Sequence, residues 1–244
     1  MSKSKPLPAP CKLCLTTATL CKSHVISDLL YKPTYDPQHR AIEMSATGNQ
    51  RFLQTGYWEY MLCEACEQRL NKLETYFSNA WPMLPTNVAG LPLVFLQGLD
   101  YTRFKLFHLS ILWRASVSTL RVFSHVALGP HAERIRRMLL TDDPGPEGVY
   151  PFIGQVLFDP SDGHVRNDMI MEPIPSKFNA LRVYVFMFGG CAWYYYVASH
   201  DPGELAPVAA RLKITGDMIL GTHNAFSLPP IAALVQRYRD AKTN

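Results

Sequence analysis

The sequence lacks any apolar run that suggests a transmembrane helix. Its most apolar stretch, residues 183–199, is interrupted by Gly189 and Gly190, which favour a tight turn between two strands. The first ten residues are polar and proline-rich and contain no apolar h-region, so we expect a disordered leader over residues 1–10 and no secretory signal. Internal repeats are absent as well. These absences favour a cytoplasmic protein with no membrane contact.

A large excess of one charge is also missing, since the formal net charge is only +4. So mild an excess does not by itself indicate nucleic acid. Its distribution is uneven, because residues 101–140 hold seven basic side chains and one acidic side chain, Glu133. Arginines clustered on helices suit contact with phosphate groups. We therefore predict that DNA contacts Arg134, Arg136 and Arg137, with simple solvation of these side chains as the alternative.

Cysteine is the residue type with the clearest pattern. Without an export signal, the six cysteines favour a reducing compartment, and therefore metal ligation over disulfides. Two C-x-x-C pairs have the spacing that lets four thiolates share one tetrahedral zinc ion. The predicted ligands are Cys11, Cys14, Cys63 and Cys66. The alternative is a set of buried or redox-active cysteines. The two others, Cys21 and Cys191, fit small buried apolar residues, although Cys21 could also be a spare ligand.

The order of motifs predicts the domain organisation. Residues 11–80 read as one zinc-dependent unit in treble-clef order, with a cysteine pair, a hairpin over residues 40–46 and 50–55, the second pair, and a helix over residues 66–79. Residues 81–100 are rich in proline and glycine and read as a linker. An α+β domain is expected over residues 101–244.

The second part combines helices with an antiparallel, strand-rich region. Apolar periodicity predicts a largely buried helix over residues 102–123, in which Arg114 is expected to pair with a carboxylate such as Asp100 or one from the strand region. Further helices are expected over residues 131–141 and 231–242. The predicted strands cover residues 150–158, 168–171, 180–188, 191–199 and 211–214. The fold class is therefore α+β: a treble-clef zinc module, a helical segment and an antiparallel β-rich domain.

The first third of the chain resembles HNH nucleases, which have a ββα-metal finger. The resemblance is carried by the first cysteine pair, the segment SHVIS at residues 23–27, and the segment LCEAC at residues 62–66. It implies that His24 is the general base and that a catalytic Mg²⁺ or Mn²⁺ ion stabilises the developing charge. Glu67 and Glu74 share a helix face and would hold that ion. A CxLC…SHxI…LLCxxCE module of this kind is similar to one in uncharacterised bacterial proteins.

The chain also departs from the HNH pattern. Ser27 replaces the family proline, and Trp58 and Glu59 stand where the family has an asparagine. The competing interpretation makes His24 a structural histidine beside the zinc, with both glutamates solvated or ion-paired.

Two functions follow from these patterns. The first is an HNH-like zinc protein that acts on or binds DNA, as a metal-dependent endonuclease. The alternative is an inactive treble-clef module that docks nucleic acid or protein within a larger assembly, such as a defence system. The aromatic run at residues 193–196 would then form either core or an interface, with a homo-oligomer or a partner protein as the occupant.

Overall fold

The fold was analysed in a computed structural model that describes residues 8–38, 41–44, 50–53, 55–229 and 231–232. Its amino-terminal part consists of short strand pairs and one long helix. The strands are β1 (Ala9–Pro10), β2 (Thr17–Ala18), β3 (Leu20–His24), β4 (Ala41–Met44), β5 (Gln50–Leu53) and β6 (Trp58–Cys63). They form the antiparallel pairs β1–β2, β3–β6 and β4–β5. The predicted hairpin matches β4 and β5, while its turn lies outside the described residues.

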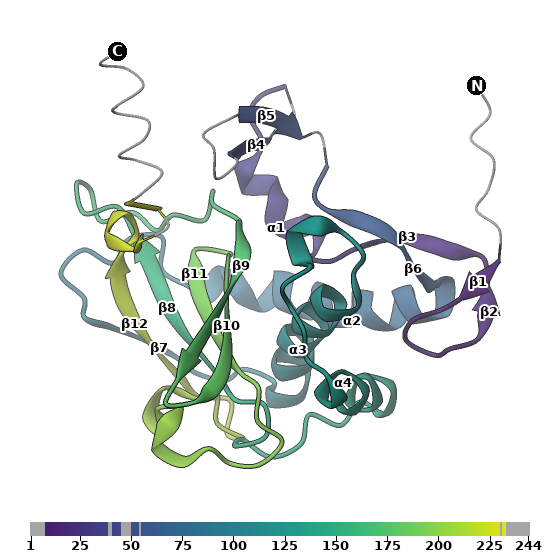
Figure 1. The fold of residues 1–244 in the computed structure, drawn as a ribbon. Coiled ribbons are helices and arrows are strands. Elements are labelled where there is room, and N and C mark those ends of the chain that lie inside the picture. Colours follow the sequence, from purple (N-terminus) through teal and green to yellow (C-terminus); the bar gives the residue numbers. More distant parts are fainter. Residues whose placement is uncertain (1–7, 39–40, 45–49, 54, 230, 233–244) are drawn as a thin grey trace.

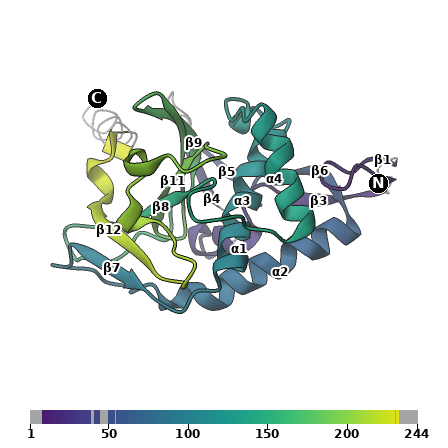
Figure 2. The ribbon, with the colours of Figure 1, turned by 90° about the horizontal axis from the view of Figure 1, so that it is seen from below.

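Helices follow the β3–β6 ribbon. A short α1 (Asp28–Tyr31) and a 3-10 turn (Lys32–Thr34) come after β3, and α2 (Glu64–Ala80) begins directly after β6. The helix α3 (Tyr101–Val117) packs against both α2 and α4 (Pro130–Thr141). Figure 2 shows α3 between these two helices, with the sheet beside it. None of the described helices is long and apolar enough to cross a membrane.

The helix α3 ends six residues earlier than the predicted end at residue 123. The carboxylate of Glu59 accepts hydrogen bonds from the backbone N–H of Thr119 at 2.9 Å and from its hydroxyl at 2.6 Å. These bonds hold the chain in an extended course after Ser118, and a separate 3-10 turn, Arg121–Phe123, follows. The long-range contact therefore ends a helix whose apolar pattern continues.

A six-stranded sheet forms the other half of the molecule (Figure 1). Its order is β7-β12-β8-β11-β10-β9. The strands are β7 (Leu93–Leu96), β8 (Phe152–Phe158), β9 (Met171–Phe178), β10 (Leu181–Phe188), β11 (Cys191–Tyr196) and β12 (Met218–Asn224). Four of the pairings are antiparallel, as predicted, but β12 runs parallel to β8, so the sheet is mixed. The α+β class is confirmed.

Two predicted strands differ from the observed ones. Residues 211–214 are not a strand, because Lys213 begins a turn in which Gly216 donates its N–H to the carbonyl oxygen of Lys213 at 2.8 Å, and β12 starts only at Met218. The predicted strand over residues 168–171 overlaps β9 only at Met171. Strand β9 extends to Phe178 although it contains Pro173 and Pro175. It lies at the edge of the sheet, where prolines are tolerated. The predicted Gly189–Gly190 turn is confirmed, with positive φ angles of 60° and 80°.

One buried apolar cluster joins the cysteine-rich part to the sheet. Phe77 of α2 stacks on Phe107 of α3 at a centroid distance of 4.0 Å, and Phe104 of α3 lies against Phe152 and Trp193 of the sheet. The aromatic run of β11 is mostly core, as one of its two interpretations stated. In Figure 1, α2 and α3 lie between the sheet and the β3–β6 ribbon.

The stretch that the sequence marks as a linker, residues 81–100, contains both the 3-10 turn Trp81–Met83 and strand β7. The indole N–H of Trp81 donates to the carbonyl oxygen of Gly189 at 2.8 Å. This stretch is therefore packed against the sheet.

Candidate metal centre and the residues around it

The four predicted zinc ligands lie together. The sulfur atoms of Cys11, Cys14, Cys63 and Cys66 all lie within 4.8 Å of one another, and those of Cys14 and Cys63 are 3.7 Å apart. A tetrahedral zinc ion with sulfur bonds of about 2.3 Å requires sulfur–sulfur distances of roughly 3.8 Å. The four side chains therefore fit one metal ion such as zinc.

Local backbone structure places each cysteine. In the first pair, the backbone N–H of Cys11 donates to the carbonyl oxygen of Thr16, and the carbonyl oxygen of Cys11 accepts from the N–H of Leu15. Leu15 adopts a left-handed φ of 66°. In the second pair, Cys63 ends β6 and caps α2, and Cys66 lies in the first turn of that helix. A helix N-terminus favours negative charge, and it therefore favours the thiolate form that binds a metal.

The remaining environment of the sulfurs is mixed. A backbone hydrogen bond from Thr16 lowers the pKa of Cys14 to about 6, whereas burial raises the pKa of Cys63 and of Cys66. Metal binding takes the place of the protons on such thiols. Cys21 is partly buried and is not among the four clustered ligands, while Cys191 is fully buried, as predicted.

His24 ends β3, on the strand that follows the first cysteine pair. Its Nε2 atom lies 3.6 Å from Oδ1 of Asp28 but is buried without a hydrogen-bond partner. Burial lowers the pKa of His24, so the imidazole is neutral near pH 7. A neutral imidazole is the form that a general base requires.

Glu74 is bound by a buried arginine. Its Oε1 atom lies 2.8 Å from Nη1 of Arg114, and its Oε2 atom accepts a hydrogen bond from the hydroxyl of Ser27 at 2.8 Å. Arg114 is 1% exposed and also donates to the carbonyl oxygen of His24 at 2.7 Å. Its predicted burial is confirmed, but its carboxylate partner is Glu74 instead of the suggested Asp100.

Glu67 lies seven residues, or about two turns, before Glu74 on α2. Its Oε1 atom is buried without a hydrogen-bond partner, and burial raises the pKa of this carboxyl. Within the part of the chain that the structure describes, the four cysteines are the one group of three or more His, Cys, Asp or Glu side chains with ligand atoms as close as 4.8 Å. His24, Glu67 and Glu74 do not form such a group.

The three arginines of α4 differ in their surroundings. Arg136 binds Glu133 and donates to the carbonyl oxygen of Leu13, in the turn of the first cysteine pair. Arg137 is 75% exposed and also binds Glu133. Arg134 is exposed and donates to the hydroxyl of Ser199. The helix therefore presents two exposed arginines, while Arg136 connects it to the metal centre.

The solvent face of the β3–β6 ribbon carries aromatic and basic side chains that the sequence analysis did not select. The ammonium of Lys22 lies 4.3 Å from the ring centroid of Trp58. The ring of Tyr60, a residue 43% exposed, meets that of Trp58 edge-on at 5.7 Å. Lys22 is paired with Tyr60 across the ribbon, and only this strand register brings the three together.

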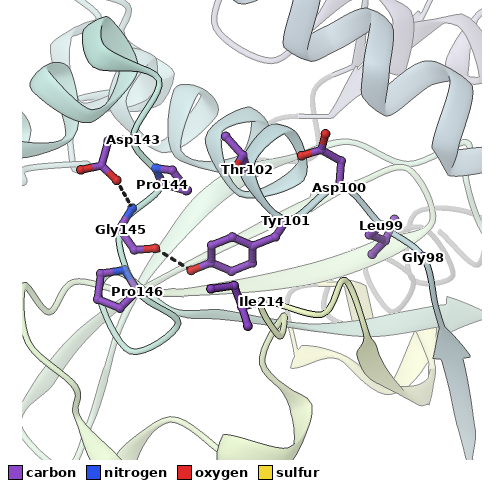
Figure 3. Close-up of a pocket in the computed structure, with 10 residues that line it drawn as sticks. All are labelled: Gly98, Leu99, Asp100, Tyr101, Thr102, Asp143, Pro144, Gly145, Pro146 and Ile214. Carbon is purple, nitrogen blue, oxygen red and sulfur yellow. Dashed lines mark hydrogen bonds between the residues drawn. The ribbon is translucent and has the colours of Figure 1, made fainter.

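The N-terminal end of α3, opposite to the end that carries Arg114, borders a cavity of about 720 Å³. Figure 3 shows Tyr101 on its wall, donating from its hydroxyl to the carbonyl oxygen of Gly145 at 2.7 Å. Behind this wall, the ammonium of the buried Lys105 donates to the Tyr101 hydroxyl at 2.9 Å and to the carbonyl oxygen of Pro146 at 2.6 Å. Burial lowers the pKa of Lys105 to about 7.

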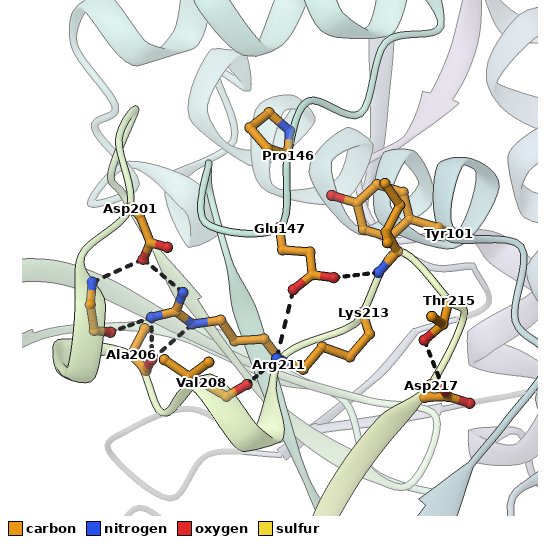
Figure 4. A network of polar contacts seen from close by, with 12 residues as sticks. Tyr101, Pro146, Glu147, Asp201, Ala206, Val208, Arg211, Lys213, Thr215 and Asp217 are labelled. Atoms are coloured by element: carbon orange, nitrogen blue, oxygen red, sulfur yellow. Dashed lines mark hydrogen bonds and ion pairs between the residues drawn. The ribbon is translucent and has the colours of Figure 1, made fainter.

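A polar network closes the same end of the molecule (Figure 4). The buried guanidinium of Arg211 donates to Oδ1 of Asp201 and to the carbonyl oxygen of Ala206, each at 2.8 Å. Glu147 accepts from the backbone N–H of Ile214 at 2.6 Å and lies 3.6 Å from the ammonium of Lys213. Each charge in this network has a protein partner, which indicates a structural role.

Comparisons with protein-family models, with curated proteins and with solved structures found no match to this chain.

Proposed function

We propose that this chain is a zinc-stabilised nucleic-acid-binding module with an HNH-like treble-clef arrangement, in which a buried ion pair takes the place of the catalytic metal. The order of elements supports the arrangement. One cysteine pair precedes the β3–β6 ribbon, and the second lies between β6 and the first turn of α2. Zinc is the expected metal, because four thiolates in tetrahedral spacing are its usual structural ligands.

This proposal rests mainly on the ion pair between Glu74 and Arg114. The HNH resemblance implies a metal ligand on α2, but both oxygens of Glu74 are bound by protein groups at 2.8 Å. A fixed guanidinium next to this carboxylate also repels a divalent cation. Binding without cleavage is therefore the function that this arrangement supports best.

The ribbon face supports nucleic acid as the partner. Trp58 and Tyr60 offer ring surfaces for bases, and Lys22 supplies a positive charge beside them. Aromatic rings combined with cations are the usual means of binding single strands, with about 1–3 kcal/mol per stacked base. Arg137 of α4 adds an exposed charge for the phosphate backbone.

Fluorescence anisotropy with a labelled single-stranded oligonucleotide tests the binding. We expect affinity that falls with salt, and at least a ten-fold loss in a Lys22→Gln/Tyr60→Ala variant. Lys72→Gln is the matched control, because Lys72 is exposed on α2 away from the ribbon face. Absence of binding at low salt, or equal affinity in the double variant and the control, would contradict this proposal.

The metal-dependent endonuclease is the second candidate, and the buried, unpartnered Nε2 of His24 is the observation in its favour. A plasmid-nicking assay with Mg²⁺ or Mn²⁺ separates the two. A chain that only binds nucleic acid is expected to leave the plasmid intact. Cleavage that His24→Ala abolishes would establish the endonuclease instead.

A further inference from the structure

Four basic side chains lie together beside the first turns of α4, and we call them the α4 basic cluster. They come from three segments of the chain: α4 itself, the start of β10, and the loop after β11. The members are His131, Arg134, Arg182 and His200. The positive charges of the other three lower the pKa of His131 further, after the larger effect of its burial. Elements distant in sequence therefore bring two arginines and two histidines to one place.

Backbone hydrogen bonds fix this arrangement. Tyr150 donates from its N–H to the carbonyl oxygen of Ala198 at 2.7 Å, and Val197 donates to that of Arg182 at 2.9 Å. Side chains extend the same frame. The hydroxyl of Tyr150 lies 3.0 Å from Nδ1 of His131. Arg134 donates to the hydroxyl of Ser199, next to His200. The cluster is therefore held by the sheet and α4 together.

The positive charge of the cluster is not neutralised within the described part of the chain. The adjacent carboxylates in sequence are Glu133 and Asp201, and both are bound elsewhere. Glu133 binds the guanidinium groups of Arg136 and Arg137, and Asp201 binds that of Arg211. No described ion pair involves Arg134 or Arg182, although both are exposed. Two permanent positive charges thus face solvent without a counter-charge, which favours an anionic ligand.

The local backbone adds to this preference. The twelve-residue helix α4 begins at Pro130, and its N-cap, Gly129, provides no side-chain cap. The positive end of the helix dipole therefore adds to the field of Arg134 and Arg182. The hydroxyls of Tyr150 and Ser199 supply neutral hydrogen-bonding groups beside the guanidinium of Arg134, and the guanidinium of Arg182 donates to the carbonyl oxygen of Ala127. Guanidinium groups bind phosphate oxygens in pairs, with a geometry that matches their planar N–H groups.

We propose that the α4 basic cluster is a binding site for a phosphate group. The phosphate group belongs to the backbone of a nucleic acid, and that part of the inference rests on the proposed function. The phosphate chemistry itself does not, because inorganic phosphate presents the same oxygens to the same groups. The site is distinct from the ribbon face and contains three residues, His131, Arg182 and His200, that the α4 arginine pattern did not indicate.

The test uses the full zinc-loaded chain and an Arg134→Gln/Arg182→Gln variant. Isothermal titration measures inorganic phosphate, and anisotropy measures a single-stranded oligonucleotide over a salt series. We expect the variant to bind each at least ten-fold more weakly, with a salt slope reduced by about 2. Arg103→Gln/Arg121→Gln is the matched control, because it removes two exposed charges outside the cluster. Unchanged zinc content and melting temperature show that each variant is folded.

The outcomes separate this inference from the proposed function. Loss of phosphate binding in the cluster variant alone supports the phosphate site, even if no oligonucleotide binds and the proposed function fails. Equal phosphate and oligonucleotide affinities in the cluster variant and the control overturn the site, even if the ribbon variant shows that the chain binds nucleic acid. A wild-type chain that binds neither inorganic phosphate nor oligonucleotide overturns it as well.

Discussion

The guanidinium of Arg114 lies 2.8 Å from the carboxylate of Glu74 and 2.7 Å from the carbonyl oxygen of His24. One side chain of α3 thereby joins α2 and the end of β3. Arg114 is 1% exposed, whereas the Glu74 side chain is 17% exposed, so the cation depends on its partner more than the anion does. The same contact that disfavours a catalytic ion holds the amino-terminal module against the helices.

Breaking this pair is expected to destabilise the protein strongly. Glu74→Gln leaves the buried guanidinium without a counter-charge, for which about 3–5 kcal/mol is typical. Arg114→Met removes the charge itself. Glu74→Gln should therefore cost less free energy of unfolding when it is added to Arg114→Met than when it is made in the wild-type chain. Urea denaturation of both single variants and of the double variant Arg114→Met/Glu74→Gln, all with saturating zinc, measures the coupling. Additive losses, within about 0.5 kcal/mol, would show that the two side chains do not interact.

Metal binding is expected to contribute directly to folding. Elemental analysis should find one zinc ion per chain, and Cys63→Ser should reduce that content. If Cys63→Ser lowers the free energy of unfolding by about 3 kcal/mol, the melting temperature should fall by roughly 6–12 °C in a chain of this size. Cys21→Ser is the control and should retain both the zinc and the melting temperature, because Cys21 is outside the four-sulfur group. Full zinc content in Cys63→Ser would refute the predicted ligand set.

The buried Lys105 predicts a rise in stability with pH. Its pKa is lowered to about 7 in the folded chain, chiefly by burial and against the opposing charges of Glu147 and Asp143. The pKa of an unfolded lysine is about 10.4. Between these values the unfolded chain binds a proton that the folded chain does not, so the free energy of unfolding increases with pH, by at most about 1.4 kcal/mol per unit. Below pH 7 Lys105 is protonated in both the folded and the unfolded chain, so it adds no further dependence of stability on pH.

Comparison with Lys105→Met isolates that effect, because titrating groups that do not contact Lys105 are common to both proteins. The hydroxyl of Tyr101 does contact Lys105, but burial raises its pKa, so it stays protonated over this range. The stability of the wild type relative to the variant should increase from pH 7 to pH 10, as measured by urea denaturation at several pH values. A difference that is constant over this range would mean that Lys105 keeps its ordinary pKa.

Two glycines with positive φ angles should respond differently to alanine. Gly216 has a φ of 84°, and a Cβ atom there would lie 2.1 Å from the backbone oxygen of Leu99. Gly129 has a φ of 56° and no atom within 4 Å of such a Cβ. Gly129→Ala should cost about 1–3 kcal/mol from the backbone conformation alone, because a φ of 56° with a ψ of −132° is readily adopted only by glycine, and Gly216→Ala should cost clearly more. Equal losses in thermal unfolding would contradict the close approach of Leu99.

The sequence predicts local features of this fold better than long-range ones. The cysteine ligands follow from spacing within each pair, and the helices and the Gly189–Gly190 turn follow from local periodicity and backbone preference. The end of α3 is set by Glu59, which is distant in sequence from Thr119, and no local signal marks it. The parallel pairing of β12 with β8 is equally invisible, since strand order depends on the whole chain.

The same division applies to the candidate site. Sequence spacing singles out His24, Glu67 and Glu74, but it does not show that Arg114 comes from α3 to bind Glu74. Lys22 and Tyr60 become neighbours only through the register of β3 against β6. Such contacts depend on how elements pack, and pattern analysis along one segment cannot provide them.

The position of β7 in the sheet has a consequence for synthesis on the ribosome. In the described structure, β7 (Leu93–Leu96) pairs only with β12 (Met218–Asn224), which is translated much later. The cysteine pairs, in contrast, are complete once Cys66 has emerged. The four-cysteine cluster can therefore form early on the nascent chain, whereas the apolar residues of β7 stay unpaired until β12 has been synthesised, and a chaperone can bind them in that interval.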